Sequence, residues 1–321
     1  WSAVWDFCDI QGQKGQTFLE NGDAMPGARF FPEARLNFAE NLLAGRGDGD
    51  ALVFRGEDKV QYGLSWDELR ALVSRLQQAM RSLGVGSGDR VAAMLPNLPE
   101  TIAAMLAATS LGDKGVLARF GQIEPKLFIA CDGYWYNGKK QDVSEKLKTV
   151  EAELKPLKTV IVPYAGDAER LVASLEKPTT LESFIEPINA SDITFEQLPF
   201  EHPVYIMFSS GTTGIPKCIV HSAGGTLLQH VKEQRLHCGM QAGDRVFYFT
   251  TCGWMMWNWL GSALACEATL CLYDGSPFYP DGNVLFDYAA EEKFTFFGTS
   301  AKYIDAVRKE GLTPKTTHDL A

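Results

Sequence analysis

The chain has 321 residues, 45% of them hydrophobic and 22% charged, which indicates a folded globular protein of roughly two domains of about 100–200 residues each. Its 30 Lys and Arg against 40 Asp and Glu give a formal net charge of −10. This balance excludes a global positive field for a nucleic-acid backbone or an anionic bilayer, so any anionic ligand must be bound locally.

Membrane and secretory features are not expected. The longest apolar runs, residues 101–111 and 254–266, are shorter than the ~18–20 residues that a membrane span requires. The opening WSAVWDFCDIQGQ lacks a signal-peptide pattern, and the seven cysteines include no C-x-x-C pair. We therefore expect a cytoplasmic protein without a membrane span, a disulfide framework or a thiolate zinc site.

Strand-like and helix-like segments alternate from residue 52 onwards. Before them, Gly and Pro interrupt residues 1–50, which we interpret as an extension packed on the main domain. Ser65 and Glu68 form a capping-box pattern, and apolar residues then recur at helical spacing until Gly84. A strand at residues 90–95 and a helix at 99–111 follow. Further strands are expected at residues 126–131, 159–164, 204–208, 245–250, 268–273 and 294–298, and further helices at residues 284–292 and 300–309.

This alternation predicts an α/β fold of helix-covered sheets in several layers, with ligands bound beyond the carboxyl ends of the strands. We divide it into a first subdomain over residues 51–200 and a second over residues 201–321. Gly112 continues directly into Asp113 where the alternation would place a strand, so we expect residues to be missing there. Residues 316–319 resemble the polar start of another helix, and the chain is therefore expected to be a fragment.

The segment SSGTTGIPK, residues 209–217, has the composition of a phosphate-binding loop. Its backbone N–H groups and hydroxyls can converge on a polyphosphate, and Lys217 adds one positive charge. Gly211 and Gly214 allow the backbone to approach a phosphate without a Cβ clash. A flexible Ser/Thr/Gly linker is the alternative, but the position between two apolar strands favours the loop. The spacing fits neither a Walker A loop nor a G-x-G-x-x-G turn.

The longer sequence FSSGTTGIPKCIVHSAGG resembles the phosphate-binding signature of the adenylate-forming enzymes, the superfamily of acyl- and aryl-CoA synthetases, adenylation domains and luciferases. Cys218 stands where most relatives carry glycine. The segments YFTTCGWMMWNWL, RFFPEARLNFAENLL and VGSGDRVAAMLPNLPETIAAMLAATSLG are similar to the short-chain acyl-CoA synthetase branch. The resemblance covers nearly the whole chain. It implies the large amino-terminal domain of such an enzyme, truncated before the small carboxyl-terminal domain.

The resemblance implies a two-step reaction. ATP and a carboxylate give an acyl-adenylate and pyrophosphate, and the thiol of coenzyme A then displaces AMP. Acetoacetate is the expected acid, Mg²⁺ would bridge the phosphates, and no partner beyond small-molecule substrates is expected. The implied contacts to the ATP phosphates are Ser209, Ser210, Gly211, Thr212, Thr213, Gly214 and Lys217. The family's adenine, ribose and magnesium segments and its catalytic lysine would lie beyond residue 321, so no catalytic residue is assigned.

Two further sites follow from the resemblance. Trp254, Met255 and Met256 would shape the acyl pocket, although Trp254 as an ordinary core aromatic is the alternative; Trp257 and Trp259 are expected to be packing residues. In CDGYWYNGKK, Lys139 and Lys140 stand where acetyl-CoA synthetases carry arginines that contact a CoA phosphate. A solvated turn is the alternative there.

Other functions remain open at this point. Within the superfamily they are an acetyl- or propionyl-CoA synthetase, a medium-chain acyl-CoA synthetase and a peptide-synthetase adenylation domain. Outside it, the chain could be a non-catalytic protein that binds a nucleotide or CoA. Pyrophosphate exchange separates the enzymes from the binding protein, because a binding protein cannot return pyrophosphate into ATP.

Overall fold

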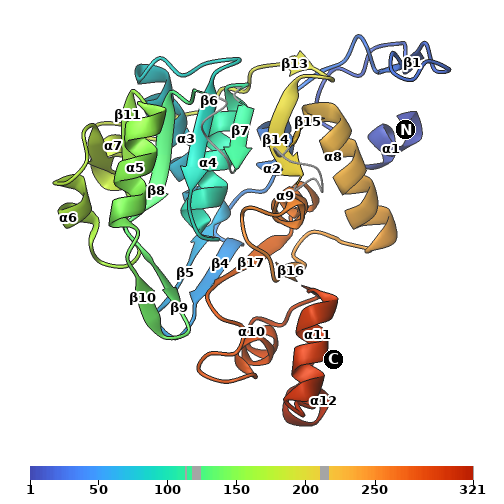
Figure 1. The fold of residues 1–321 in the computed structure, drawn as a ribbon. Coiled ribbons are helices and arrows are strands. Elements are labelled where there is room, and N and C mark those ends of the chain that lie inside the picture. Colours follow the sequence, from blue (N-terminus) through green and yellow to red (C-terminus); the bar gives the residue numbers. More distant parts are fainter. Residues whose placement is uncertain (113, 118–123, 210–216, 321) are drawn as a thin grey trace.

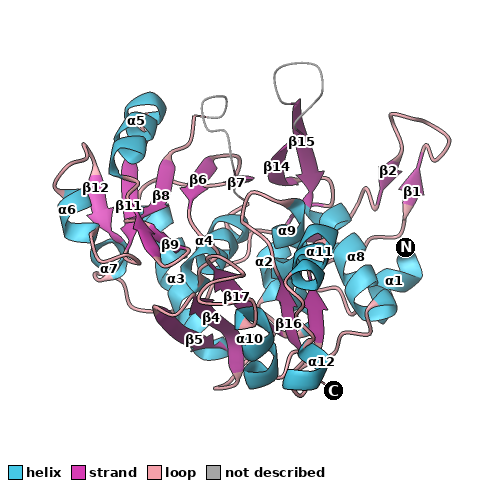
Figure 2. Ribbon diagram, turned by 60° about the horizontal axis from the view of Figure 1, so that its bottom comes forward, coloured by secondary structure: helices cyan, strands magenta, loops and turns pink. Residues whose placement is uncertain are grey.

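The computed structural model describes residues 1–112, 114–117, 124–209 and 217–320. Two mainly parallel sheets enclose a middle layer of helices, and further helices cover the outer face of each sheet (Figures 1 and 2). Three clusters of buried residues account for this layering. One lies between the sheets, one under α5 (Ser144–Leu154) and α6 (Ala168–Val172), and one under α10 (Val284–Glu292) and α11 (Ala301–Lys309).

The larger sheet has seven strands in the order β12-β11-β8-β6-β7-β14-β15. All neighbours are parallel except β14 and β15, which run antiparallel. Its strands are β6 (Arg90–Met94), β7 (Lys114–Leu117), β8 (Leu127–Cys131), β11 (Lys158–Val162), β12 (Pro178–Thr180), β14 (Pro203–Ser209) and β15 (Lys217–Ser222).

The smaller sheet has five strands in the order β18-β16-β17-β4-β5, again parallel except for its last pair. They are β4 (Asp50–Gly56), β5 (Val60–Ser65), β16 (Arg245–Tyr248), β17 (Thr269–Asp274) and β18 (Phe296–Gly298). Three two-stranded pairs join β1 (Leu19–Glu20) to β2 (Arg29–Phe30), β3 (Arg35–Leu36) to β13 (Leu198–Pro199), and β9 (Tyr134–Tyr136) to β10 (Lys139–Gln141).

The middle layer is centred on α4 (Pro99–Ser110), in which every residue except Glu100 is buried. A helix that is apolar on all sides must be covered on all sides. Both sheets and the neighbouring helices cover it. The other helices of this layer are α2 (Phe38–Leu42), α3 (Trp66–Ser82), α8 (Ala223–Lys232) and α9 (Met255–Ser262), while α1 (Ser2–Phe7), α7 (Leu181–Ile185) and α12 (Pro314–Thr317) are peripheral.

Most predicted elements are confirmed. The capping box at Ser65 and Glu68 is present, and the helix at residues 284–292 has the predicted bounds. The sequence pattern shows no strand after Gly112, but β7 lies there and pairs with β6 and β14. Its Lys-Gly-Val-Leu sequence is too short to show a pattern, and hydrogen bonds to strands on both sides define it instead.

The domain boundary predicted after residue 200 remains a prediction. Each sheet contains strands from both sides of that position. In the larger sheet β14 and β15 lie with β6, β7, β8, β11 and β12, and in the smaller one β16, β17 and β18 lie with β4 and β5. Among the helices in the described ranges, none has the length and apolar content that a membrane crossing requires.

Two helical glycines differ in the space around them. A Cβ at Gly224 in α8 would lie 2.2 Å from Phe200 Cδ2, whereas a Cβ at Gly261 in α9 would lie 3.6 Å from Met105 Cε. We expect Gly261→Ala to stabilise the protein by about 0.5–1 kcal/mol through helix propensity. Gly224→Ala should destabilise it, because the clash outweighs that gain. Thermal unfolding of both variants checks this, and a stabilised Gly224→Ala protein would contradict the close packing.

Candidate functional site

Two cavities open near the carboxyl ends of the strands. The first, which we call the hairpin cavity, has a volume of 390 Å³ and lies between the ends of β6, β8, β16 and β17, beside the β9–β10 hairpin. The second, the α8–α9 cavity, has a volume of 550 Å³ and is bounded by these two helices and by β14, β15, β16 and β18. Both occupy the edge of an α/β fold at which ligands bind.

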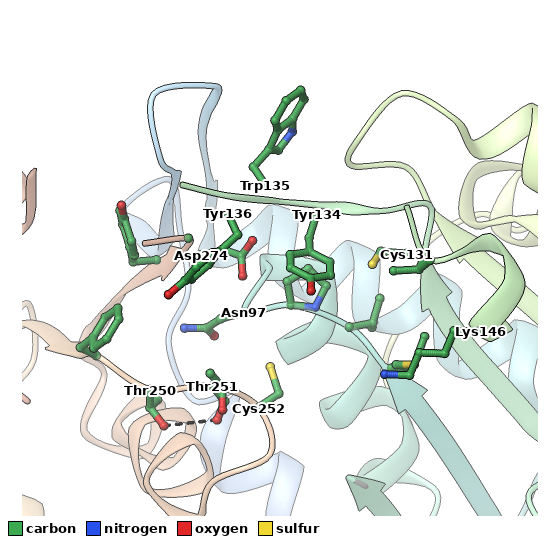
Figure 3. A pocket seen from close by; sticks show the side chains of 17 residues that line it. Asn97, Cys131, Tyr134, Trp135, Tyr136, Lys146, Thr250, Thr251, Cys252 and Asp274 are labelled. Atoms are coloured by element: carbon green, nitrogen blue, oxygen red, sulfur yellow. Dashed lines mark hydrogen bonds between the residues drawn. The ribbon is translucent and has the colours of Figure 1, made fainter. Parts of the chain in front are cut away.

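Tyr134 and Tyr136 lie on the face of the hairpin that is turned toward Asn97, and Trp135 lies on its other face (Figure 3). The Asn97 side chain is buried and accepts a hydrogen bond at Oδ1 from Trp257 Nε1 at 2.8 Å. That bond fixes the orientation of the amide, because an indole N–H can only donate. Asn97 Nδ2 is thus a donor that has no partner among the described residues.

A partly buried carboxyl group also faces the hairpin cavity. Burial raises the pKa of Asp274 to about 7, although the hydroxyl of Tyr164, which donates to Asp274 Oδ2 at 3.1 Å, acts in the opposite direction. The charge of Glu57 raises the same pKa further. Asp274 therefore titrates near neutral pH, and Asp274 and Asn97 both line the cavity.

The side chain of Glu57 hydrogen-bonds to the turn of the β9–β10 hairpin. Its buried carboxylate follows β4 and accepts backbone N–H groups from Asn137 at 2.6 Å, Gly138 at 2.9 Å and Ser276 at 2.8 Å. A side chain of the five-stranded sheet thereby fixes a hairpin that follows β8 of the other sheet. Gly275 is required beside it, because a Cβ there would lie 2.2 Å from Glu57 Cγ.

The raised pKa of Asp274 predicts a pH-dependent stability. The neutral form is favoured in the fold, so ionisation destabilises the protein as pH rises from about 4 to about 7, by up to on the order of 4 kcal/mol. Asp274→Asn removes this titration and keeps an acceptor for Tyr164. Its stability advantage over the native protein should be small at pH 4.5 and large at pH 8, measured by urea unfolding. The exposed Asp23→Asn is the control, and an advantage independent of pH would disprove the assignment.

The α8–α9 cavity combines apolar walls with one polar side. Met207, Tyr248, Met255, Met256, Trp259 and Phe296 are among its apolar residues. Thr226, Gln229, His230 and Glu233 reach it from α8 and its π-helical continuation (Glu233–His237), and Asn258 reaches it from α9. Their spacing along α8 follows one face of a helix, which explains how a single element supplies the polar side.

The phosphate-loop residues are only partly described. Ser209 ends β14 and pairs directly with Lys217, the first residue of β15. Lys217 is exposed. Ser210, Gly211, Thr212, Thr213 and Gly214 lie outside the described residues. The two strands that flank the loop also line the α8–α9 cavity, through Met207 and Val220.

Of the three predicted acyl-pocket residues, two line the α8–α9 cavity and the third, Trp254, is not among its lining residues. Met255 and Met256 line the α8–α9 cavity. Trp254 precedes α9 at its N-cap and is 59% exposed, so it is not a core aromatic. Trp257 and Trp259 are buried, as predicted for packing residues.

The two lysines predicted to contact CoA differ in their surroundings. Lys140 Nζ lies 2.8 Å from Asp167 Oδ2. Lys139 is exposed on the same strand and has no ion-pair partner within the described ranges. The turn between β9 and β10 has positive φ at both Asn137 and Gly138, which is the geometry of a tight two-residue hairpin.

The sequence matches a family model described as AMP-binding enzyme over residues 39–321, and the chain belongs to this family. It is 67% identical over 332 residues to an acetoacetyl-coenzyme A synthetase of Rhizobium meliloti, covering 100% of this chain and 51% of the relative. A malonamoyl-CoA synthetase of Penicillium aethiopicum is 38% identical over 351 residues, covering 98% of this chain and 48% of that protein.

The solved structure of the acetoacetyl-CoA synthetase from Streptomyces lividans matches the fold with a TM-score of 0.93 and 36% identity. The match covers 100% of this chain and 51% of that one. The chain therefore spans about half the length of these relatives. The predicted fold class, the large α/β domain of an adenylate-forming enzyme, is confirmed.

Proposed function

We propose that the protein is an AMP-forming acid–CoA ligase that activates acetoacetate with ATP and transfers the acyl group to CoA. The observation that supports this most strongly is the 67% identity to an acetoacetyl-coenzyme A synthetase across the whole chain. Because the chain spans about half of that relative, the complete reaction is proposed for the whole enzyme.

The names of two relatives share one chemical feature. The acetoacetyl and malonamoyl groups both carry a second carbonyl, on the third carbon counted from the carboxyl carbon. The proposed substrate is thus a short acid with a carbonyl at C3, and not simply a short aliphatic acid. A pocket for it needs apolar walls and at least one hydrogen-bond donor.

We assign the acid to the α8–α9 cavity. It lies beside the strands that flank the phosphate loop, so a carboxylate bound in it would be close to the nucleotide. The flexible side chains of Met255 and Met256 form part of the apolar wall of this cavity. Trp254, exposed at the start of the same helix, is proposed to close the pocket from its open side.

Residues 209–214 and Lys217 are proposed to hold the β- and γ-phosphates and to stabilise the charge that develops on pyrophosphate as it leaves. The described residues contain no group of three or more His, Cys, Asp or Glu side chains that could hold a metal ion. Mg²⁺ therefore remains a prediction, and we assign no step to it.

The β9–β10 hairpin is proposed to contact CoA, with Lys139 as the phosphate contact. Lys140 is the weaker candidate because its charge is already paired with Asp167.

Pyrophosphate exchange tests the proposed activity. The full-length enzyme should exchange labelled pyrophosphate into ATP with acetoacetate as the preferred acid among acetate, propionate, acetoacetate, butyrate and hexanoate. Gly211→Val should abolish the exchange in a folded protein, because a side chain there occupies the space of the phosphate. Preference for another acid would favour a different acyl-CoA synthetase, and no exchange with any acid would favour a non-catalytic binding protein. Unchanged exchange by Gly211→Val would refute the loop assignment.

The two hairpin lysines provide a matched pair for CoA binding. Lys139→Ala should raise the KM for CoA about 3- to 5-fold, the effect of one exposed charge contact of up to about 1 kcal/mol. Lys140→Ala should change it less, since Asp167 already neutralises that charge. The KM for ATP should stay constant in both. Steady-state kinetics measure the KM for CoA of both variants, and equal increases would argue against a specific role for Lys139.

A further inference from the structure

This inference rests on the proposed function, and it concerns which group of the protein recognises the C3 carbonyl. His230 lines the α8–α9 cavity from α8 and is 8% exposed. Its Nδ1 lies 2.8 Å from Ser262 Oγ on α9. No described residue forms a hydrogen bond with the other ring nitrogen, Nε2. The ring is therefore held at Nδ1, and Nε2 of this cavity-lining residue has no partner among the described residues.

The imidazole is neutral at physiological pH. Burial lowers the pKa of His230 to about 4, and nearby His221, which also lines the cavity, lowers it too. A neutral imidazole carries one proton, on either Nδ1 or Nε2. The partner of Nδ1 decides which nitrogen is protonated.

Ser262 permits either tautomer. Its hydroxyl lies 2.8 Å from His230 Nδ1 and 2.9 Å from the backbone oxygen of Asn258. When the hydroxyl donates to the Asn258 oxygen, Nδ1–H donates to Oγ and Nε2 is an acceptor. When the hydroxyl turns to Nδ1, Nε2 carries the proton and is a donor. A ligand carbonyl, which only accepts, selects the second state.

Two further residues that line this cavity, Thr226 and Asn258, carry buried polar atoms. Thr226 Oγ1 and Asn258 Oδ1 are buried and lack partners among the described residues. Thr226 lies one helical turn before His230 on α8, and Asn258 lies one turn before Ser262 on α9. An unpartnered buried polar group is costly, and of these two atoms only the Thr226 hydroxyl could donate to a carbonyl oxygen.

We propose that His230 Nε2–H donates a hydrogen bond to the C3 carbonyl oxygen of the bound acid and thereby sets the preference for 3-oxo acids. Ser262 acts as the positioning residue that holds the orientation of the ring and allows the Nε2–H tautomer that the ligand selects. Butyrate, which has CH₂ at C3, leaves the donor unpaired and is rejected for that reason.

The test compares acetoacetate with butyrate in the full-length enzyme. His230→Phe should lower the ratio of kcat/KM for acetoacetate to that for butyrate at least 10-fold, and thermal unfolding of the variant reports whether it is folded. His230→Gln, which keeps an N–H donor, should retain more of the preference than His230→Phe. Ser262→Ala should lower the ratio less than His230→Phe. An unchanged ratio in an active His230→Phe enzyme overturns the proposal.

A second measurement does not depend on the folding of a variant. In the native enzyme with ¹⁵N-labelled histidine, the acetoacetate complex should show Nε2 of His230 as a protonated nitrogen. An unprotonated Nε2 in that complex overturns the proposal. If the native enzyme does not use acetoacetate at all, the proposed function has failed; if it does, and the ratio stays constant in His230→Phe, only the role of His230 has failed.

Discussion

The need to cover α4 on every side governs this fold. A single sheet has one face to offer a helix, and a helix with Ile102, Leu106 and its other apolar residues buried requires more than that. The two sheets therefore face each other across a shared helical layer, and residues from strands of both sheets line one seam. Both cavities lie along this seam, so the position of the site follows from the packing of one helix.

The two cavities are chemically different although they are built from adjacent elements. The hairpin cavity has two tyrosines, a carboxyl group and an amide donor, and Glu57 holds one of its walls rigidly. The α8–α9 cavity has thioether and aromatic walls and a neutral imidazole. This difference supports separate places for a short acid and for a larger, more polar substrate.

Local patterns predicted the fold well. The capping box at Ser65, the strand positions and the burial of Trp257 all depend on residues close in sequence or on apolar content. The polar contacts of the site were not predictable in this way. Glu57 binds Asn137 and Ser276 across separations of 80 and 219 residues, and His230 meets Ser262 across 32. No spacing rule connects such positions, and for Trp254 the resemblance suggested a pocket but not its exposure at a helix start.

The interleaving of the sheets has a consequence for synthesis on the ribosome. Strand β4 is apolar and pairs on one side with β5, its neighbour in the chain, and on the other with β17. Thr269 even hydrogen-bonds to the backbone of Asp50, 219 residues earlier. At about 5–20 residues per second, roughly 10 to 40 s separate the emergence of the two strands. During that interval one edge of β4 is unpaired, and the nascent chain must be protected there from aggregation.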